Sequence, residues 1–318
     1  MHQRDVSVRN FGHWSSEIYG LGILYRQLLA WSRIHPLPFT SEHGIPFGTS
    51  SLHYASEGPR RSGARPLHLT WNLEVHAEAK RRGILSIRIP HPWSVAWRRG
   101  GKKRNVKWNG PLLLVPHSLP QVKPTREREF WVNLLDHTVA NEPPAAALIS
   151  HHDLGGVAEG ELLRRHIPIF SLGRATSDLF FDRFYDFVGQ FTHVVSPNLS
   201  SASFYSTDFG IPFQLIGEEL AFDYHAVRAK MGKDAHDLHS RAEFKTTATN
   251  LFSTPLRSRS QMLNNQISEL VWRELSLDLL DYPFDQLGSE LARRRSANLA
   301  VRVLLRNLVG VVSRGGSE

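Results

Sequence analysis

The chain has 318 residues, with 38 lysines and arginines, 30 aspartates and glutamates, and no cysteine. The formal net charge of +8 favours anionic partners, and the lack of cysteine excludes disulfides, thiolate metal sites and a cysteine nucleophile. No apolar run approaches the ~20 residues that span a bilayer, and residues 1–10 lack the apolar core of a signal peptide. We therefore expect a cytoplasmic protein, with any attachment to a membrane surface being peripheral and through charge.

Residues 1–100 are predicted to form a reduced α/β domain. Apolar residues at helical spacing between Ile18 and Trp31 indicate a first helix. Glu42 and His43 follow an extended proline-containing stretch, and their simplest interpretation is a solvated turn. A strand, a helix, its capping glycine and a second strand come next, at Leu67–Trp71, Leu73–Arg82, Gly83 and Ile84–Ile89.

A run of basic residues around two glycines separates this domain from the next: Arg98, Arg99, Lys102, Lys103, Arg104 and Lys107. Such a run is usually a solvated and flexible connection, and it marks the best domain boundary in the chain. The functional alternative is a basic arm that meets phosphate groups or anionic lipid headgroups.

Residues 101–225 are predicted to form a Rossmann-like domain with a parallel sheet. Short apolar runs alternate with segments of helical spacing, as in a sheet that helices cover on both faces. The predicted strands are Leu112–Val115, Ala145–Ile149, Ile167–Phe170, Thr192–Val195 and Pro212–Ile216. Ligands of such sheets sit beyond the carboxyl ends of the strands, so the polar residues found there are the candidate site.

These strand ends carry the candidate residues His117, Ser118, Ser171, Arg174, Ser196, Asn198, Ser200, Ser201, Ser203 and Glu218. The serine-rich segment 196–203 joins a strand to a helix, where unpaired backbone N–H groups and the helix dipole favour an anion. Ordinary N-capping is the alternative, because serine and asparagine are the usual caps. His117 is a candidate phosphate donor, and Glu218 is a candidate acceptor for ribose hydroxyls.

Common catalytic signatures are missing from the sequence. It has no phosphate loop, G-x-G-x-x-G, nucleophile elbow or H-E-x-x-H, and no D-x-D to hold a divalent metal. His151-His152-Asp153 resembles a metal-binding group in composition only. Adjacent strand residues point to opposite faces, so we expect one of these histidines to face away and predict no metal site.

In the remaining residues, 226–318, the sequence pattern typical of strands no longer appears. Helical patterns are expected at 224–240, Met262–Leu280 and Leu287–Val312, and Arg293–Arg295 forms a second basic group. We therefore predict a helical C-terminal segment.

Several segments resemble the C-terminal half of GT-B glycosyltransferases: PHS at 116–118, SLG at 171–173 and VVSPNLSSASFYSTDFGIPFQLIGEE at 194–219. They are similar to bacterial surface-polysaccharide biosynthesis proteins related to sialyltransferase-like folds. In that group a serine-rich helix start precedes G-I/K-P and a strand ending in GE. PLPFTSEHG at 36–44 and IPHPW at 89–93 also resemble segments of the group, and the likeness covers roughly residues 28–222.

The resemblance implies a GT-B-like α/β fold of two Rossmann-like units, with the final helix packed back on the N-terminal domain. It also implies a metal-independent glycosyltransferase with no cofactor, a nucleotide-sugar donor and a glycan or lipid-linked acceptor. Glu42 and His43 would supply the general base across the cleft, while His117 and Arg174 would balance charge on the leaving phosphate.

Two alternatives stay open. A non-catalytic GT-B-like binding module is favoured by the short N-terminal domain, and a nucleotide-sugar epimerase would share the serine-rich helix start. An anionic membrane is a further candidate partner, through Arg98–Lys107 and Arg293–Arg295. Nucleic acid is not expected, because the basic residues lie in loops without aromatic-rich strand motifs.

Overall fold

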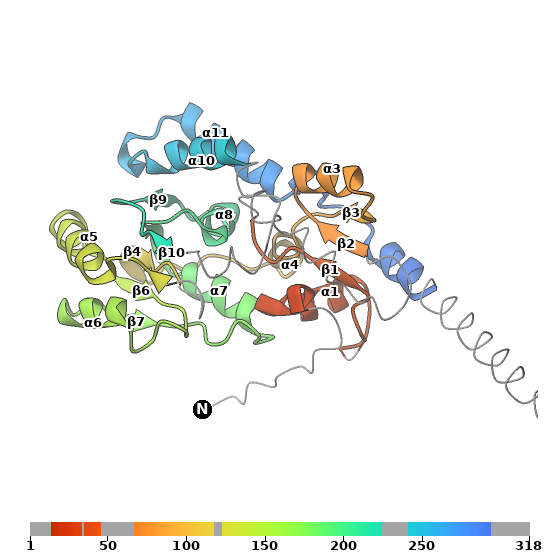
Figure 1. Cartoon of the computed structure of the whole chain (residues 1–318), viewed down its shortest axis with the longest axis horizontal. Coiled ribbons are helices and arrows are strands. Elements are labelled where there is room, and N and C mark those ends of the chain that lie inside the picture. The colour runs from red at the N-terminus through yellow and green to blue at the C-terminus, as the bar shows by residue number, and fades with distance from the viewer. Residues whose placement is uncertain (1–13, 34, 46–66, 118–122, 224–240, 294–318) are drawn as a thin grey trace, which may run out of the picture.

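The computed structural model describes residues 14–33, 35–45, 67–117, 123–223 and 241–293. Figure 1 shows two α/β units side by side, with the larger sheet at one end of the molecule and the smaller sheet at the other. Helices α10 (Ala242–Ser253) and α11 (Gln261–Glu274) lie along one side of the pair.

The N-terminal unit is built on a parallel sheet of β1 (Phe39–Ser41), β2 (Leu67–Thr70) and β3 (Ser86–Arg88), in that order. Its helices are α1 (Leu21–Leu28), α3 (Leu73–Arg81) and α4 (Pro92–Arg99). The predicted strand–helix–strand unit is confirmed. Asn72 caps α3 by accepting a hydrogen bond from the Val75 N–H (3.0 Å), and Gly83 ends it with a φ of 68°.

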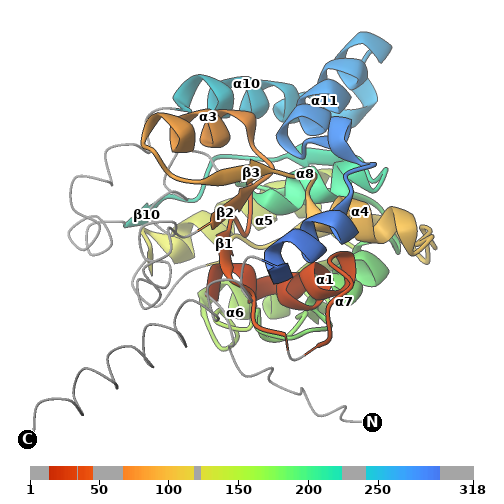
Figure 2. The same ribbon diagram turned by 90° about the vertical axis from the view of Figure 1, so that its right-hand side faces the viewer.

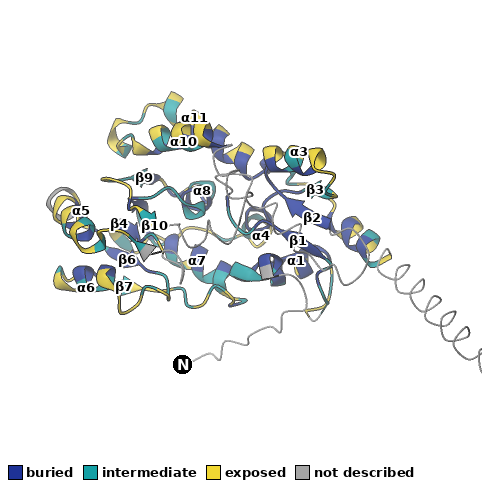
Figure 3. Ribbon diagram, in the orientation of Figure 1, coloured by how far each residue is buried: buried dark blue, intermediate teal, exposed yellow. Residues whose placement is uncertain are grey.

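Within the described residues, the second unit holds five parallel strands in the order β7-β6-β4-β8-β9. These are β4 (Trp108–Leu114), β6 (Ala146–Leu148), β7 (Ile169–Phe170), β8 (Phe191–Ser196) and β9 (Phe213–Leu215). Helices α5 (Glu127–Asn141), α6 (Val157–Arg164), α7 (Phe180–Val188) and α8 (Ser201–Asp208) alternate with them. Figure 3 shows helices with exposed outer faces around the sheet, and its central strands β4, β6 and β8 are mostly buried, so this part of the prediction is confirmed.

The structure contains a small antiparallel strand pair that the sequence pattern does not predict. Strand β5 (Lys123–Pro124) pairs with β10 (Phe222–Asp223), which brings the end of the second unit back against its early part. Each strand has two residues, which is too short for an alternation of apolar and polar residues to mark it.

The basic run between the units is attached to the second unit rather than being a free connection. Arg98 forms an ion pair with Asp208 (2.6 Å). The Arg104 guanidinium donates hydrogen bonds to the backbone carbonyls of Phe191, Thr192 and Gly210. Guanidinium groups present several donors in a fixed fork, and that geometry suits a cluster of strand-edge carbonyls.

The C-terminal segment contacts both units. In the second unit, Phe252 of α10 packs its ring against Phe204 and Phe213. The chain then crosses back, where the Trp31 Nε1–H donates to the carbonyl of Gly288 (3.2 Å). Residues 284–293 are helical, and Figure 2 shows this helix beside α1. The predicted helices at 224–240 and beyond residue 293, with Arg294 and Arg295, lie outside the described residues.

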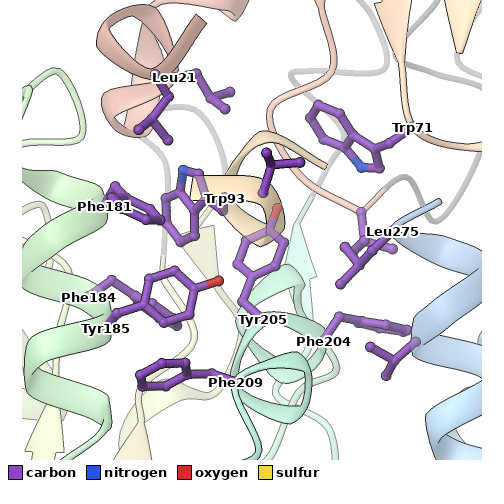
Figure 4. Packing of buried hydrophobic residues seen from close by; sticks show 14 of the residues in the cluster. Leu21, Trp71, Trp93, Phe181, Phe184, Tyr185, Phe204, Tyr205, Phe209 and Leu275 are labelled. Atoms are coloured by element: carbon purple, nitrogen blue, oxygen red, sulfur yellow. The ribbon is translucent and has the colours of Figure 1, made fainter. Parts of the chain in front are cut away.

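One hydrophobic cluster runs through both units and the C-terminal helices. Figure 4 shows Trp93 of α4 at its centre, between Phe181 and Phe184 of α7 on one side and Tyr205 of α8 on the other. The Trp93 ring centroid lies 4.8 Å from that of Tyr205 and 5.3 Å from that of Phe184. Among the described helices, none has both the length and the apolar character needed to cross a bilayer.

Candidate functional site

The carboxyl ends of the two parallel sheets meet where the loop after β1 touches the start of α8. The Ile45 N–H donates to the Ser201 hydroxyl over 2.7 Å. A Cβ on Gly44 would lie only 2.5 Å from the Ser201 Oγ, so this close approach leaves no room for a side chain. The loop that carries Glu42 and His43 in the first unit therefore contacts Ser201 of the second unit through Gly44 and Ile45.

Glu42 is not in a solvated turn. Its side chain is 1% exposed, and its carboxylate accepts a hydrogen bond from the Trp71 N–H (3.3 Å). Burial raises the pKa of both Tyr25 and Tyr205, and the nearby Glu42 carboxylate raises each of them further. Glu42 is thus an enclosed carboxylate that lies near two buried tyrosines and holds the backbone just after β2.

His43 is half-buried and its ring stacks on Tyr19, with centroids 6.1 Å apart. Tyr19 adopts a φ of 59°, packs on Phe180 and donates its N–H to the Ala175 carbonyl (2.5 Å). Burial raises the pKa of Tyr19. Residues just before α1 thus reach across to the loop after β7 and cover His43.

Two further residues belong to this site and were missed as site residues from the sequence. His91, after β3, lies 3.1 Å from the Tyr205 hydroxyl through its Nε2, and both side chains are buried. Burial lowers the pKa of His91 well below its ordinary value, so the ring is neutral at neutral pH. Tyr205 also interacts with the Ser201 hydroxyl, which links His91 to the loop bearing Glu42.

Most of the other serine-segment residues have structural roles. Ser200 and Ser203 form a capping box at the start of α8, with the Ser200 N–H donating to the Ser203 Oγ (3.1 Å). Ser203 is fully buried, so its side chain is not open to a ligand, contrary to its prediction as a site residue. The Ser196 hydroxyl donates to the Leu114 carbonyl, and Asn198 exchanges two hydrogen bonds with the Leu220 backbone. Of this segment, Ser201 makes the contact between the two units.

The remaining candidates spread along the edge of the larger sheet. Ser171, Arg174 and Glu218 are exposed, and the Ser171 Oγ accepts from the Gly173 N–H (3.3 Å). His117 is exposed, yet desolvation lowers its pKa; Asp153 opposes this effect and His152 adds to it. Ser118 lies outside the described residues.

The expectation that His151 and His152 face opposite ways is wrong. Their ring centroids are 3.8 Å apart, because the two residues sit in a turn after β6 rather than on a strand. Burial lowers the pKa of His151, with smaller contributions from His152 and Arg174. No group of three or more metal-ligating side chains is found in the part of the chain that the structure describes.

Comparisons with protein-family models, with curated proteins and with solved structures found no match for this chain. The geometry and chemistry of the residues above therefore carry the functional argument.

Proposed function

We propose that the protein is a metal-independent glycosyltransferase of the GT-B type, which uses a nucleotide-activated sugar in bacterial surface-polysaccharide synthesis. The observation that carries this proposal is the contact between Ile45 and Ser201, at which the carboxyl ends of two parallel sheets face each other. Open α/β sheets bind their ligands at such edges. The return of the chain to the first unit at Gly288 is a second supporting feature.

In this proposal His43 is the general base for the acceptor hydroxyl. It is half-buried, whereas the Glu42 carboxylate is enclosed and holds the Trp71 backbone. A base must come within hydrogen-bond distance of the proton that it removes, which favours the more accessible side chain. Glu42 then serves to fix the loop by accepting the hydrogen bond from the Trp71 N–H.

The donor would lie along the edge of the larger sheet. Arg174 is an exposed cation that can neutralise charge on the leaving phosphate, and His117 can donate a hydrogen bond to it. Because the His117 pKa is lowered, its contribution at neutral pH is a hydrogen bond rather than a charge. Glu218, exposed after β9, is the candidate contact for ribose hydroxyls.

Nucleotide release from a panel of nucleotide sugars, with glycan and lipid-linked acceptors, tests this function. We expect release with one donor, and a His43→Ala variant should lose about 10²–10⁴-fold in kcat, the usual contribution of a general base. Lys107→Ala, on the exposed connection, is the control and should keep full activity.

The outcomes separate the alternatives. Interconversion of sugars without nucleotide release would identify an epimerase. Donor binding without any turnover would identify a non-catalytic module, which the complete burial of Glu42 also favours as the second candidate. An unchanged kcat in His43→Ala would contradict the assigned base.

A further inference from the structure

A cavity of about 610 Å³ lies apart from Glu42 and Ser201, between α1, α4 and the start of α7. Ligand sites for small molecules commonly have volumes of this size. Its walls come from both units, since α1 and α4 belong to the first and α7 to the second.

One part of the cavity is apolar. Ile23, Leu24 and Leu28 of α1 contribute to its lining, as do Leu179 and Phe181 at the start of α7. Leu24 and Phe181 are also members of the main hydrophobic cluster, so this wall is held by the packed core rather than by a mobile surface.

The lining also contains charged residues, and its cations are not all neutralised. Lys102 is paired with Asp182 (3.1 Å) and with Asp186 (2.6 Å). Arg33 and Arg99, by contrast, form no hydrogen bond or ion pair with any described residue, and both are exposed at the cavity. Asp178 also lines it; burial raises the pKa of this carboxyl, Glu17 raises it as well, and Arg26 and Arg33 oppose the rise.

We propose that this cavity binds a single-chain anionic amphiphile, with its phosphate head on Arg33 and Arg99 and its hydrocarbon chain along the apolar wall. Guanidinium groups bind phosphate through paired, charge-assisted hydrogen bonds. The side-by-side arrangement of a basic rim and an apolar wall matches a ligand with both characters better than a free phosphate or a neutral lipid. It also gives Arg99, part of the basic run, a ligand-binding role.

The identity of this amphiphile as the lipid-linked acceptor rests on the proposed transferase function. Its binding does not, because the cavity is separate from the residues assigned to catalysis. A binding measurement without donor therefore tests the cavity alone, and the nucleotide-release assay tests the reaction alone.

The experiment is calorimetric titration of the full-length protein with octyl phosphate below its micelle concentration. We expect saturable binding that weakens at least about tenfold in the Arg33→Gln/Arg99→Gln double variant, since one charge-assisted hydrogen bond contributes that much or more. Leu179→Glu, which places a carboxylate on the partly exposed apolar wall, should also weaken binding.

The matched control is Lys103→Gln/Lys107→Gln, which removes the same charge from exposed positions outside the cavity and should leave the affinity unchanged. Inorganic phosphate tests the charged head alone, and octyl glucoside tests the hydrocarbon chain without the charge. Each should bind far more weakly than octyl phosphate. The proposal is overturned by no binding of octyl phosphate, by equal binding of either half-ligand, or by equal weakening in the control pair. Variants are compared after thermal melting shows that they fold, with Arg99→Gln alone as the milder substitute.

Discussion

At the scale of single residues, His91 decides how the site responds to acid. Its Nε2 faces the Tyr205 hydroxyl, and its ring packs edge-on against Trp71 with centroids 4.4 Å apart. Protonation would place a positive charge in this enclosed, aromatic environment. The folded protein therefore favours the neutral ring, and the pKa of His91 falls well below that of an exposed histidine.

The sign of the pH effect follows from this pKa. In the unfolded chain His91 takes up a proton as the pH falls through about 6.5, whereas in the folded protein it resists. The contribution of the neutral His91 to the unfolding free energy is thus fully present above that pH and is lost as the pH falls below it. Replacing His91 with glutamine, which keeps a polar group near Tyr205, should remove this contribution.

We expect the wild-type unfolding free energy to fall by up to about 2 kcal/mol more than that of His91→Gln between pH 6.5 and 5. Urea unfolding at several pH values measures both curves. The pKa values of His76, His117, His151 and His193 are also lowered, and their contributions are common to both proteins. Parallel curves would contradict the assignment to His91.

At the scale of elements, a buried ion pair joins the C-terminal helices to the first unit. Arg241, just before α10, lies 2.5 Å from Glu274 at the end of α11, and both side chains are 1% exposed. The same Glu274 oxygen accepts from the Asn72 side chain (2.8 Å), which caps α3. Burial raises the pKa of Glu274, and Arg241 opposes this rise. Helices α3, α10 and α11 are therefore held at one point.

Glu274→Ala should lower the unfolding free energy by about 3 kcal/mol, the lower end of the cost of breaking a buried ion pair, because Arg241 keeps its contact with Glu74 (2.8 Å). Glu269→Ala, at an exposed position on the same helix, is the control and should change stability by about 0.5 kcal/mol or less. Equal, small effects from the two substitutions would show that the pair adds nothing to stability.

Elements were predicted well where one chain segment determines them. The five strands of the larger sheet follow from apolar runs such as Thr192–Val195, which lies in the mostly buried strand β8. The helix predicted at Met262–Leu280 ends early, at Glu274, because Ser276 adopts a φ of 49° and hydrogen-bonds to the Trp71 carbonyl. The pairing of His91 with Tyr205, 114 residues apart, depends on tertiary packing that no local spacing encodes.

At the scale of the whole molecule, the shared hydrophobic cluster makes the two units one folding unit. The cluster extends from Leu21 to Leu291 and includes residues of both sheets. If one unit unfolds, the apolar surface that the other unit buries against it becomes exposed to water, which is unfavourable. We therefore expect a single unfolding transition in urea.

Tryptophan fluorescence and far-UV circular dichroism, recorded on the same samples, check this expectation. The fluorescence reports the environment of side chains such as Trp71 and Trp93, and the dichroism reports the helices of both units. Their midpoints should coincide. Two separated transitions would contradict a shared core and would point to units that fold independently.

The contacts that the C-terminal segment makes with the first unit also determine when that unit can finish folding during synthesis. The His91 N–H donates to the Leu275 carbonyl (2.9 Å), and the Ser276 hydroxyl donates to the carbonyl of Trp71. The ribosome makes Trp71 and His91 some two hundred residues before these partners, and at about 5–20 residues per second that is a delay of roughly ten seconds or more. The first unit is thus completed only after these residues of the C-terminal segment have been made, and until then the surface that they cover stays exposed on the nascent chain.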